Sequence, residues 1–291
     1  MTVPRDRGEF LSEFRIRNRG LIADSDQSAL SEARFLIAGC GSTGGAAIEP
    51  LVRAGAMRMI LVEPGQYELH NLNRQRATLE AIGHNKAAWL ANSARAINPY
   101  LDFEVHETGV SSQNVVGLTA RADLIIDAID VTSMEGLTAK CALHEAAAAA
   151  RRPVVSAYDL AYRQYVSIYD YRRLRAPLRG ELNRVRGAQT PTEALARLIP
   201  FGAIPYELVE EIERLQSEPG ASISQLGCAA DLFGALVVPL AVEMLANRRV
   251  KESYVLDLKD PLLPFSRRAA RRVKTVSGLI RLKVRMFRSG T

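Results

Sequence analysis

Residues that build metal sites and disulfide frameworks are scarce in this sequence. Its 291 residues include only three cysteines and four histidines, and the cysteines lie far apart without a Cys-x-x-Cys pair. The histidines show no ligand spacing either. These counts argue against a structural zinc site, so we expect no zinc, and they fit a reducing, cytoplasmic location. The cysteines are Cys40, Cys141 and Cys228, and we expect each to be a small apolar packing residue.

The sequence also lacks long apolar runs and targeting signals. No run approaches the roughly 20 apolar residues that span a bilayer. The first 20 residues carry charges of both signs and no apolar core, unlike a secretory signal. With 47% hydrophobic and 24% charged residues, the composition is that of a soluble globular protein.

Acidic residues are absent from the C-terminal end. From Phe265 to Thr291 there are nine Lys or Arg and no Asp or Glu, while the whole chain has a formal net charge of +6. The remainder therefore carries about −3, and the basic character belongs mainly to a tail. This tail could hold RNA phosphates or an anionic membrane surface, or it could pack on its own domain with its arginines outward.

What the sequence does contain is a glycine-rich loop between two apolar runs. RFLIAGCGSTGG (34–45) is followed by an amphipathic stretch and then by MILVE, which ends at Glu63. In this strand–loop–helix–strand order, Gly39, Gly41 and Gly44 let the backbone turn tightly and approach a phosphate at a helix N-terminus. Glu63, at the tip of the second strand, suits a hydrogen bond to a ribose hydroxyl. The pattern predicts a nucleotide site but fits NAD, FAD and ATP alike.

The alternation of elements predicts an α/β fold. We expect a Rossmann-like, mostly parallel sheet with helices on both faces and antiparallel strands at the C-terminal side. The segment 164–172 alternates in polarity, as an antiparallel strand with one exposed face would. Pro50 and Pro239 lie inside predicted helices and should kink or interrupt them. Predicted helices cover 44–55, 86–96, 112–121, 134–150 and 227–247, with weaker ones at 192–199 and 205–217, and further strands cover 101–106, 123–129, 153–158 and 252–258.

The chain divides into three parts in this interpretation. Residues 1–33 form an N-terminal arm with one short helix, and 34–260 form the nucleotide-binding domain. Within that domain, 172–226 is an inserted crossover segment without a strong strand, and 261–291 is the basic tail.

Beyond the loop, the motif HNLNRQ (70–75) makes the pattern specific. Together with the glycine loop, Lys86, AINP (96–99) and IIDAID (125–130), it resembles the ThiF/MoeB/HesA family, whose adenylation domain the ubiquitin-activating enzymes share. The resemblance covers roughly residues 15–170, with a weaker echo in 227–258. It implies ATP- and Mg²⁺-dependent adenylation of a carboxylate, which yields an acyl-adenylate and pyrophosphate.

The resemblance also implies roles for individual residues. It assigns the ribose contact to Glu63, phosphate contacts to Arg74 and Lys86, and Mg²⁺ to Asp130. The chemistry agrees, because an arginine fork and a lysine charge suit phosphate oxygens and a carboxylate suits Mg²⁺. Arg19 would reach into the nucleotide site of the neighbouring subunit, since family members are similar in working as dimers. Neutral contacts to the nucleotide are expected from Ser42, Asn71 and Gln75.

Several positions leave alternatives open. Members commonly carry a second acid where Gly65 stands, and a glycine where Ser42 stands. Asp130 could instead cap the helix that starts near Ser133. Asp127, within an apolar run, is expected to be a structural hydrogen-bonding acid. Arg19 could belong to a solvated basic face with its neighbouring arginines.

The substrate stays open at this stage. In related branches it is the C-terminal carboxylate of a ubiquitin-like or sulfur-carrier protein, a peptide C-terminus, or a small carboxylate on a modified tRNA base. Because residues 172–226 hold no cysteine, we expect the reaction to end at the adenylate or to pass it to an external nucleophile. The alternatives are a tRNA-directed adenylating dehydratase-like enzyme, a non-catalytic nucleotide-binding scaffold, and an NAD-dependent oxidoreductase.

Overall fold

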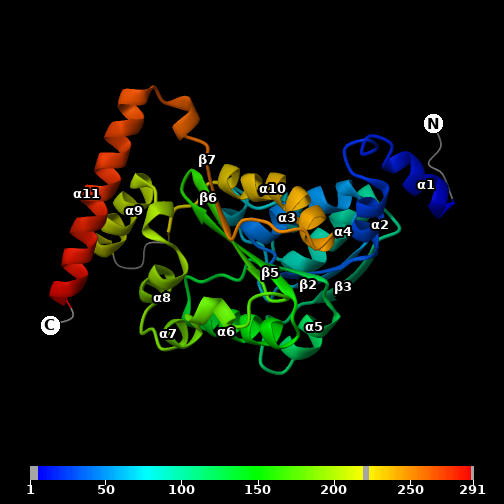
Figure 1. The fold of residues 1–291 in the computed structure, drawn as a ribbon, viewed down its shortest axis with the longest axis horizontal. Coiled ribbons are helices and arrows are strands. Elements are labelled where there is room, and N and C mark those ends of the chain that lie inside the picture. The colour runs from blue at the N-terminus through cyan, green and yellow to red at the C-terminus, as the bar shows by residue number, and fades with distance from the viewer. Residues whose placement is uncertain (1–5, 219–222, 290–291) are drawn as a thin grey trace.

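One seven-stranded sheet organises the protein, seen in a computed structural model that describes residues 6–218 and 223–289 (Figure 1). The strand order is β3-β2-β1-β4-β5-β6-β7. Strands β1 to β5 are parallel, β6 pairs with β5 in antiparallel fashion, and β7 pairs with β6 in the same way. The predicted fold class is therefore confirmed. The strands are β1 Arg34–Ala38, β2 Arg58–Val62, β3 Asp102–His106, β4 Leu124–Asp127, β5 Pro153–Leu160, β6 Arg163–Asp170 and β7 Ser253–Asp257.

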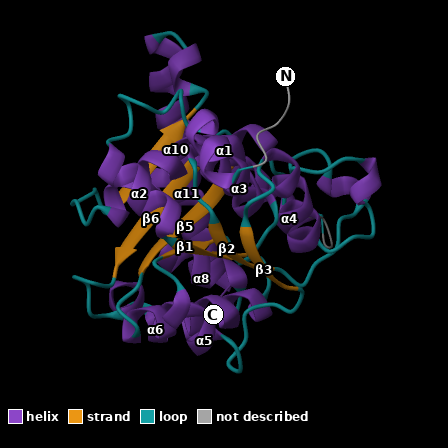
Figure 2. Ribbon diagram, turned by 90° about the vertical axis from the view of Figure 1, so that its right-hand side faces the viewer, coloured by secondary structure: helices purple, strands orange, loops and turns teal. Residues whose placement is uncertain are grey.

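Helices cover both faces of this sheet, as Figure 2 shows. On one face, α2, α3, α4 and α10 pack against alternate strand residues such as Phe35 and Ile37. On the other, α5 and α6 and the crossover helices pack against Leu36 and Ala38. The helices are α1 Arg7–Phe14, α2 Asp24–Glu32, α3 Ser42–Ala54, α4 Lys86–Ile97, α5 Val115–Arg121, α6 Met134–Ala149, α7 Leu182–Arg186, α8 Pro191–Leu198, α9 Tyr206–Ser217, α10 Gly227–Leu245 and α11 Phe265–Ser289.

The sheet brings the ends of β1, β2 and β4 to one level. Ala38 pairs with Val62 on one side and with Asp127 on the other. The chain leaves β1 toward β2 on one side and later returns to its other side as β4, so the strand order reverses between β1 and β4. Ligands of open α/β sheets bind at the carboxyl ends of the strands at such a reversal.

Two proline-containing helices continue through their prolines without the interruption that was expected. Helix α3 continues through Pro50 to Ala54, and α10 continues through Pro239. Pro50 cannot donate to the Ala46 carbonyl, but Gly234 of α10 packs there so closely that a Cβ at 234 would lie 2.7 Å from that oxygen. The close packing of the two helices stabilises α3 despite its missing hydrogen bond.

Two other expectations about elements are wrong. The interior of β6 is buried on both faces, because Val166 and Ile168 face α10 while Tyr165 and Tyr169 face the crossover segment. The N-terminal arm holds two helices, α1 and α2, rather than one. Residues 1–5 of the arm lie outside the described part of the chain.

Helix α10 also corrects the expectation about apolar runs. Its 19 residues are long and apolar enough to cross a membrane by length and composition, with 44% of the stretch buried. It packs along α3, and Phe233, Val237 and Leu240 belong to the core beneath the sheet. These contacts are those of a core helix.

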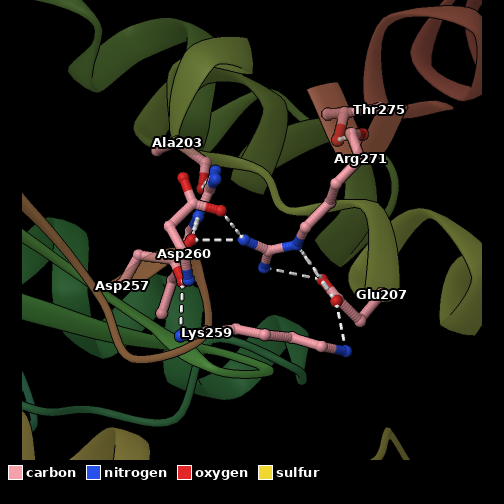
Figure 3. Close-up of polar contacts among 8 residues, drawn as sticks. Ala203, Glu207, Asp257, Lys259, Asp260, Arg271 and Thr275 are labelled. Carbon is pink, nitrogen blue, oxygen red and sulfur yellow. Dashed lines mark hydrogen bonds and ion pairs between the residues drawn. The ribbon is translucent and has the colours of Figure 1, made fainter. Parts of the chain in front are cut away.

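The basic tail is a 25-residue helix, α11, which lies against α9 at the edge of the molecule in Figure 1. Arg271, with 7% of its surface exposed, is surrounded by carboxylates (Figure 3). Its guanidinium donates to Glu207 (2.9 Å), Asp257 (2.8 Å) and Asp260. The tail therefore packs on its own domain with one arginine inward, which corrects the expectation that its arginines all point outward. The side chains of Lys283, Arg285 and Arg288 lie outside the described ones.

Candidate functional site

The glycine loop joins β1 to the N-terminus of α3. Gly39 has φ 90°, and a Cβ there would lie 2.3 Å from the Ala128 carbonyl oxygen. A Cβ at Gly44 would lie 1.9 Å from the Gly39 carbonyl oxygen. Both positions therefore require glycine, whereas a Cβ at Gly41 would meet nothing closer than 3.8 Å. The tight turn leaves the first amides of α3 without a side-chain cap, an arrangement that favours an anion.

Glu63, the predicted ribose contact, holds the loop in place. Its two carboxylate oxygens accept from the amides of Cys40 and Gly65, each at 2.8 Å. A Cβ at Gly65 would lie 2.7 Å from Glu63 Oε1, so a side chain at this position would press against that carboxylate. Each oxygen of Glu63 keeps a lone pair, and its contact with a ribose stays a prediction.

Lys86 lies beside Glu63 at the start of α4. Asn85 caps this helix by accepting from Ala88 N at 3.1 Å, which fixes the backbone of Lys86. Lys86 Nζ would be 3.4 Å from a Cβ at Gly65 and lies 6.0 Å from the Tyr67 ring centroid. Its ammonium group therefore lies beside Gly65, and its charge is close enough to Cys40 of the glycine loop to act on that thiol.

Arg74 approaches the same region from the HNLNRQ motif. It is partly buried and donates to neutral acceptors: Gln225 Oε1 (2.6 Å), the His70 carbonyl and Asn73 Oδ1 (both 3.0 Å). The bond to Gln225 ties the motif to the end of the crossover segment. A guanidinium held by neutral groups keeps its full charge for an anion.

Asn71 and Gln75 are both buried, with 4% and 8% of their surfaces exposed. Asn71 Oδ1 accepts from Glu68 N at 3.0 Å and so shapes the short turn that carries Arg74. Gln75 reaches the loop itself, because its Nε2 would be 3.8 Å from a Cβ at Gly41. Of the two amides, Gln75 is thus beside the glycine loop, while Asn71 supports the motif.

Asp130, the predicted Mg²⁺ ligand, lies three residues beyond β4 and is exposed. Its Oδ1 accepts from Thr132 N (2.9 Å) and Thr132 Oγ1 (2.7 Å). Ser133 caps α6 by accepting from Gly136 N, so the alternative that Asp130 is the cap is wrong. Across the described ranges, no group of three or more His, Cys, Asp or Glu residues converges as a metal site. One carboxylate is still compatible with Mg²⁺, which often binds through one or two carboxylates, waters and phosphates.

Asp127 is a structural acid, as expected. It is fully buried and contacts Lys140, His144 Nε2 (2.9 Å) and Ser156 Oγ (2.6 Å). Burial raises its pKa, but the charge of Lys140 and the hydrogen bond from His144 outweigh burial and hold the pKa below the usual range. His144 Nδ1 in turn meets the Tyr171 hydroxyl at 2.7 Å. This network braces β4 beneath the loop that carries Asp130.

Arg19 is not brought to this site within one chain. It is exposed and donates to Ser12 Oγ at 3.1 Å, while the adjacent Asn18 donates to the Ala54 carbonyl at the far end of α3. The 13 residues of α3 separate it from the glycine loop by roughly 20 Å. Its role in a neighbouring subunit stays a prediction.

Two of the three cysteines fit the packing role. Cys40 and Cys141 are buried, and burial raises the pKa of both thiols. Cys228 is exposed, so its expected burial is wrong. It follows Gly227, whose Cβ would lie 3.1 Å from Arg74 Cα, and the buried face of α10 begins only at Ala229. An exposed thiol at the margin of the site removes one reason for expecting the reaction to end at the adenylate.

One acid at the site was missed by the sequence analysis. Asp159, near the carboxyl end of β5, accepts a hydrogen bond from Thr43 Oγ1 in the first turn of α3 (3.0 Å). Its position directly after the end of the predicted strand 153–158 was the available signal. The contact with α3 could not be foreseen, because 116 residues separate the two partners.

Comparisons with known proteins agree with this geometry. The model of the ThiF family matches residues 15–268. Adenylyltransferase and sulfurtransferase MOCS3 of Anopheles gambiae is 29% identical over 147 residues, covering 50% of this chain and 32% of that protein. Protein HesA of Nostoc sp. is 31% identical over 135 residues, covering 46% and 52%. The resemblance drawn from the motifs is confirmed, and the chain matches only a third to a half of the length of these two relatives.

A solved structure extends the likeness to the fold. The tRNA N6-threonylcarbamoyladenosine dehydratase TcdA of E. coli, in complex with ATP, superimposes with a TM-score of 0.58. The match covers 85% of this chain and 98% of TcdA at 18% identity. At that identity the match shows a shared fold.

Proposed function

The chain belongs to the ThiF family, and from this premise we propose that it is an ATP-dependent adenylyltransferase. It joins a carboxylate to the AMP moiety of ATP and releases pyrophosphate. The observation that carries this proposal is the grouping around the uncapped N-terminus of α3: Lys86 lies beside Gly65, and Arg74 is close enough to Asp159 for its charge to act on that carboxyl group. The names of relatives support it, since MOCS3 is an adenylyltransferase and TcdA has been solved with ATP.

The chemistry requires positive charge at fixed places. A carboxylate oxygen forms a bond to the α-phosphorus, and the bond from that phosphorus to the bridging oxygen of the β-phosphate breaks. Negative charge then collects on the departing pyrophosphate. Arg74, Lys86 and the amides of α3 are positioned by the protein in advance, so they offset this charge without reorganisation. Asp130 and the phosphates would hold Mg²⁺, which supplies further positive charge when bound.

The proposed substrate is the C-terminal carboxylate of a ubiquitin-like or sulfur-carrier protein, or of a peptide. MOCS3, by its name, is also a sulfurtransferase, which suits a carrier of sulfur. A small carboxylate on a modified tRNA base is the second candidate. The coverage of TcdA and the basic residues of α11 favour it, because a basic helix can contact RNA phosphates.

We propose a homodimer in which Arg19 serves the partner's site, and a cytoplasmic location. Mixing Arg19→Ala with Arg74→Ala tests the dimer, because the mixed dimer would carry one intact site. Activity of the mixture above that of either variant alone supports the shared site. If the subunits exchange and activity is not recovered, the shared site is contradicted. Contact of α11 with an anionic membrane stays a prediction, which co-sedimentation with phosphatidylserine vesicles checks.

Exchange of labelled pyrophosphate into ATP tests the reaction. The probes are a carrier protein ending in glycine, its C-terminal peptide, and tRNA carrying threonylcarbamoyladenosine. We expect exchange with one of them and a loss of about 100-fold or more in Lys86→Ala. Arg95→Ala, an exposed arginine at the far end of α4, is the control and should exchange normally. ATP binding without exchange on any probe would favour the non-catalytic scaffold.

A further inference from the structure

Three buried polar atoms without a hydrogen-bond partner lie around the glycine loop. They are Ser42 Oγ, Gln75 Oε1 and Asp159 Oδ2, and they come from α3, the HNLNRQ motif and β5. A buried polar group that lacks a partner costs about 1–3 kcal/mol. Their gathering at one place, among the described residues, indicates that a ligand supplies the missing partners.

Asp159 is the member of this group that can change its charge. Its Oδ1 accepts from Thr43 Oγ1 at 3.0 Å. With the Gln164 amide oriented to satisfy its neighbours, its nitrogen donates to the same Oδ1 at 2.7 Å and to the Ala229 carbonyl at 2.8 Å. Oδ1 therefore has two donors, while the buried Oδ2 has none. A proton on this carboxyl group belongs on Oδ2.

The surroundings of Asp159 favour that proton. Burial raises the pKa of its carboxyl group above the ordinary value, although the hydrogen bond from Thr43, the nearby Ser42 hydroxyl and the charge of Arg74 act to lower it. Asp231 of α10 raises the pKa further. An ionised carboxylate would repel a phosphate at the N-terminus of α3, and the approach of a phosphate charge raises the pKa again.

We propose that Asp159 binds the nucleotide as a neutral acid, its Oδ2–H donating a hydrogen bond to an oxygen of the phosphate chain. Asp159 thereby completes the anion site on the side of β5, across from Lys86 and Glu63. When the free site is ionised, nucleotide binding takes up one proton from solvent. This inference rests on the proposed function, because it needs ATP at the glycine loop.

Calorimetry of Mg-ATP binding tests it, in buffers of different ionisation enthalpy between pH 5 and 8.5. Asp159→Asn keeps a neutral donor but cannot titrate, and Asp159→Ala removes the donor. We expect the wild type to take up as much as one proton more than Asp159→Asn. The ratio of their Kd values should rise with pH, by up to tenfold per unit above the pKa, and titration of the nucleotide cancels in this ratio. Asp159→Ala should bind about fivefold or more weakly at low pH.

Two further variants separate this coupling from a structural effect. Thr43→Val removes a hydrogen bond that lowers the pKa of Asp159. The pH midpoint, at which proton uptake on Mg-ATP binding is half its maximum, should therefore move upward, and this can be measured even if an Asp159 variant fails to fold. Asp102→Asn changes an exposed acid at the opposite edge of the sheet and should behave as the wild type. Equal proton uptake in the wild type and Asp159→Asn, or an unmoved midpoint in Thr43→Val, overturns the inference alone. A wild type that binds no ATP at any pH overturns the proposed function instead.

Discussion

The surroundings of Arg271 and of the glycine loop both concentrate charge, and they are built in opposite ways. Around Arg271, the guanidinium meets three carboxylates, and Lys259 completes the network at 2.8 Å from Glu207. Around the glycine loop, Arg74 is held by neutral acceptors and three buried polar atoms have no partner. The first cluster is satisfied without a ligand and attaches a helix. The second is incomplete without one, which is the property expected of a binding site.

The largest effect should come from breaking the satisfied cluster. Arg271→Ala leaves Glu207, Asp257 and Asp260 partly buried without their shared cation, so we expect a loss of about 3–5 kcal/mol in the free energy of unfolding. Urea unfolding measures it. Arg272→Ala, its exposed neighbour, should change the free energy by less than about 0.5 kcal/mol. Equal effects of the two substitutions would show that the cluster does not hold α11.

The next largest effect on stability is expected from a substitution in the glycine loop. Gly44→Ala forces a Cβ to within 1.9 Å of the Gly39 carbonyl oxygen, so the loop must shift, and we expect a loss of about 2–3 kcal/mol. Gly41→Ala has room for its methyl group and should cost less than about 1 kcal/mol. Thermal unfolding of both variants checks the pair. A Gly44→Ala protein as stable as Gly41→Ala would contradict the described geometry.

Acid should weaken the satisfied cluster first. Burial raises the pKa of Asp257, but hydrogen bonds from Arg163, Asp260 N and Arg271 outweigh it and lower the pKa to about 2. A carboxyl group whose pKa is lowered by folding stabilises the protein above its unfolded value near 4, and this contribution disappears as the pH falls toward 2. Unfolding measured between pH 5 and 2 should show a smaller loss in Asp257→Asn than in the wild type. If the free energy of unfolding fell equally with pH in both proteins, the lowered pKa of Asp257 would be contradicted.

The smallest expected effect is at Asp159 beside the glycine loop, where a rise in pH should lower stability instead of raising it. The pKa of Asp159 is raised by folding, so stability falls as the pH rises through that pKa, because the folded protein must then bury a charge. At pH 8 we expect Asp159→Asn to raise the free energy of unfolding by about 0.5–1 kcal/mol. Asp257→Asn should lower it under the same conditions. Destabilisation by both substitutions would mean that the two clusters do not differ in kind.

The sequence predicted what local geometry decides. Gly39 and Gly44 were found because a tight turn excludes a side chain, and the parallel sheet was found because strands and helices alternate. Packing between distant segments decided the rest. Burial of β6 depends on α10 and the crossover segment, and the helix around Pro50 depends on Gly234.

The same limit applies to the charged residues. Arg271 looked like any other arginine of the tail, since nothing local shows that Glu207 and Asp257 surround it. Asp159 was missed because Thr43 and Gln164 meet it only in the folded chain. The roles of Arg74, Lys86 and Asp130 came from the family motif, and the structure adds that Arg74 is left without a competing carboxylate among its described partners.

Calorimetric titration of Mg-ATP and of NAD, on the wild type and on Arg74→Ala, tests the central claim most directly. That claim is that Arg74, Lys86 and the unpaired polar atoms at the glycine loop bind the phosphates of ATP. We predict binding of ATP in the micromolar range without binding of NAD, and a loss of affinity of about tenfold or more in Arg74→Ala. Binding of NAD but not ATP, with an affinity indifferent to Arg74, would contradict it and favour the oxidoreductase.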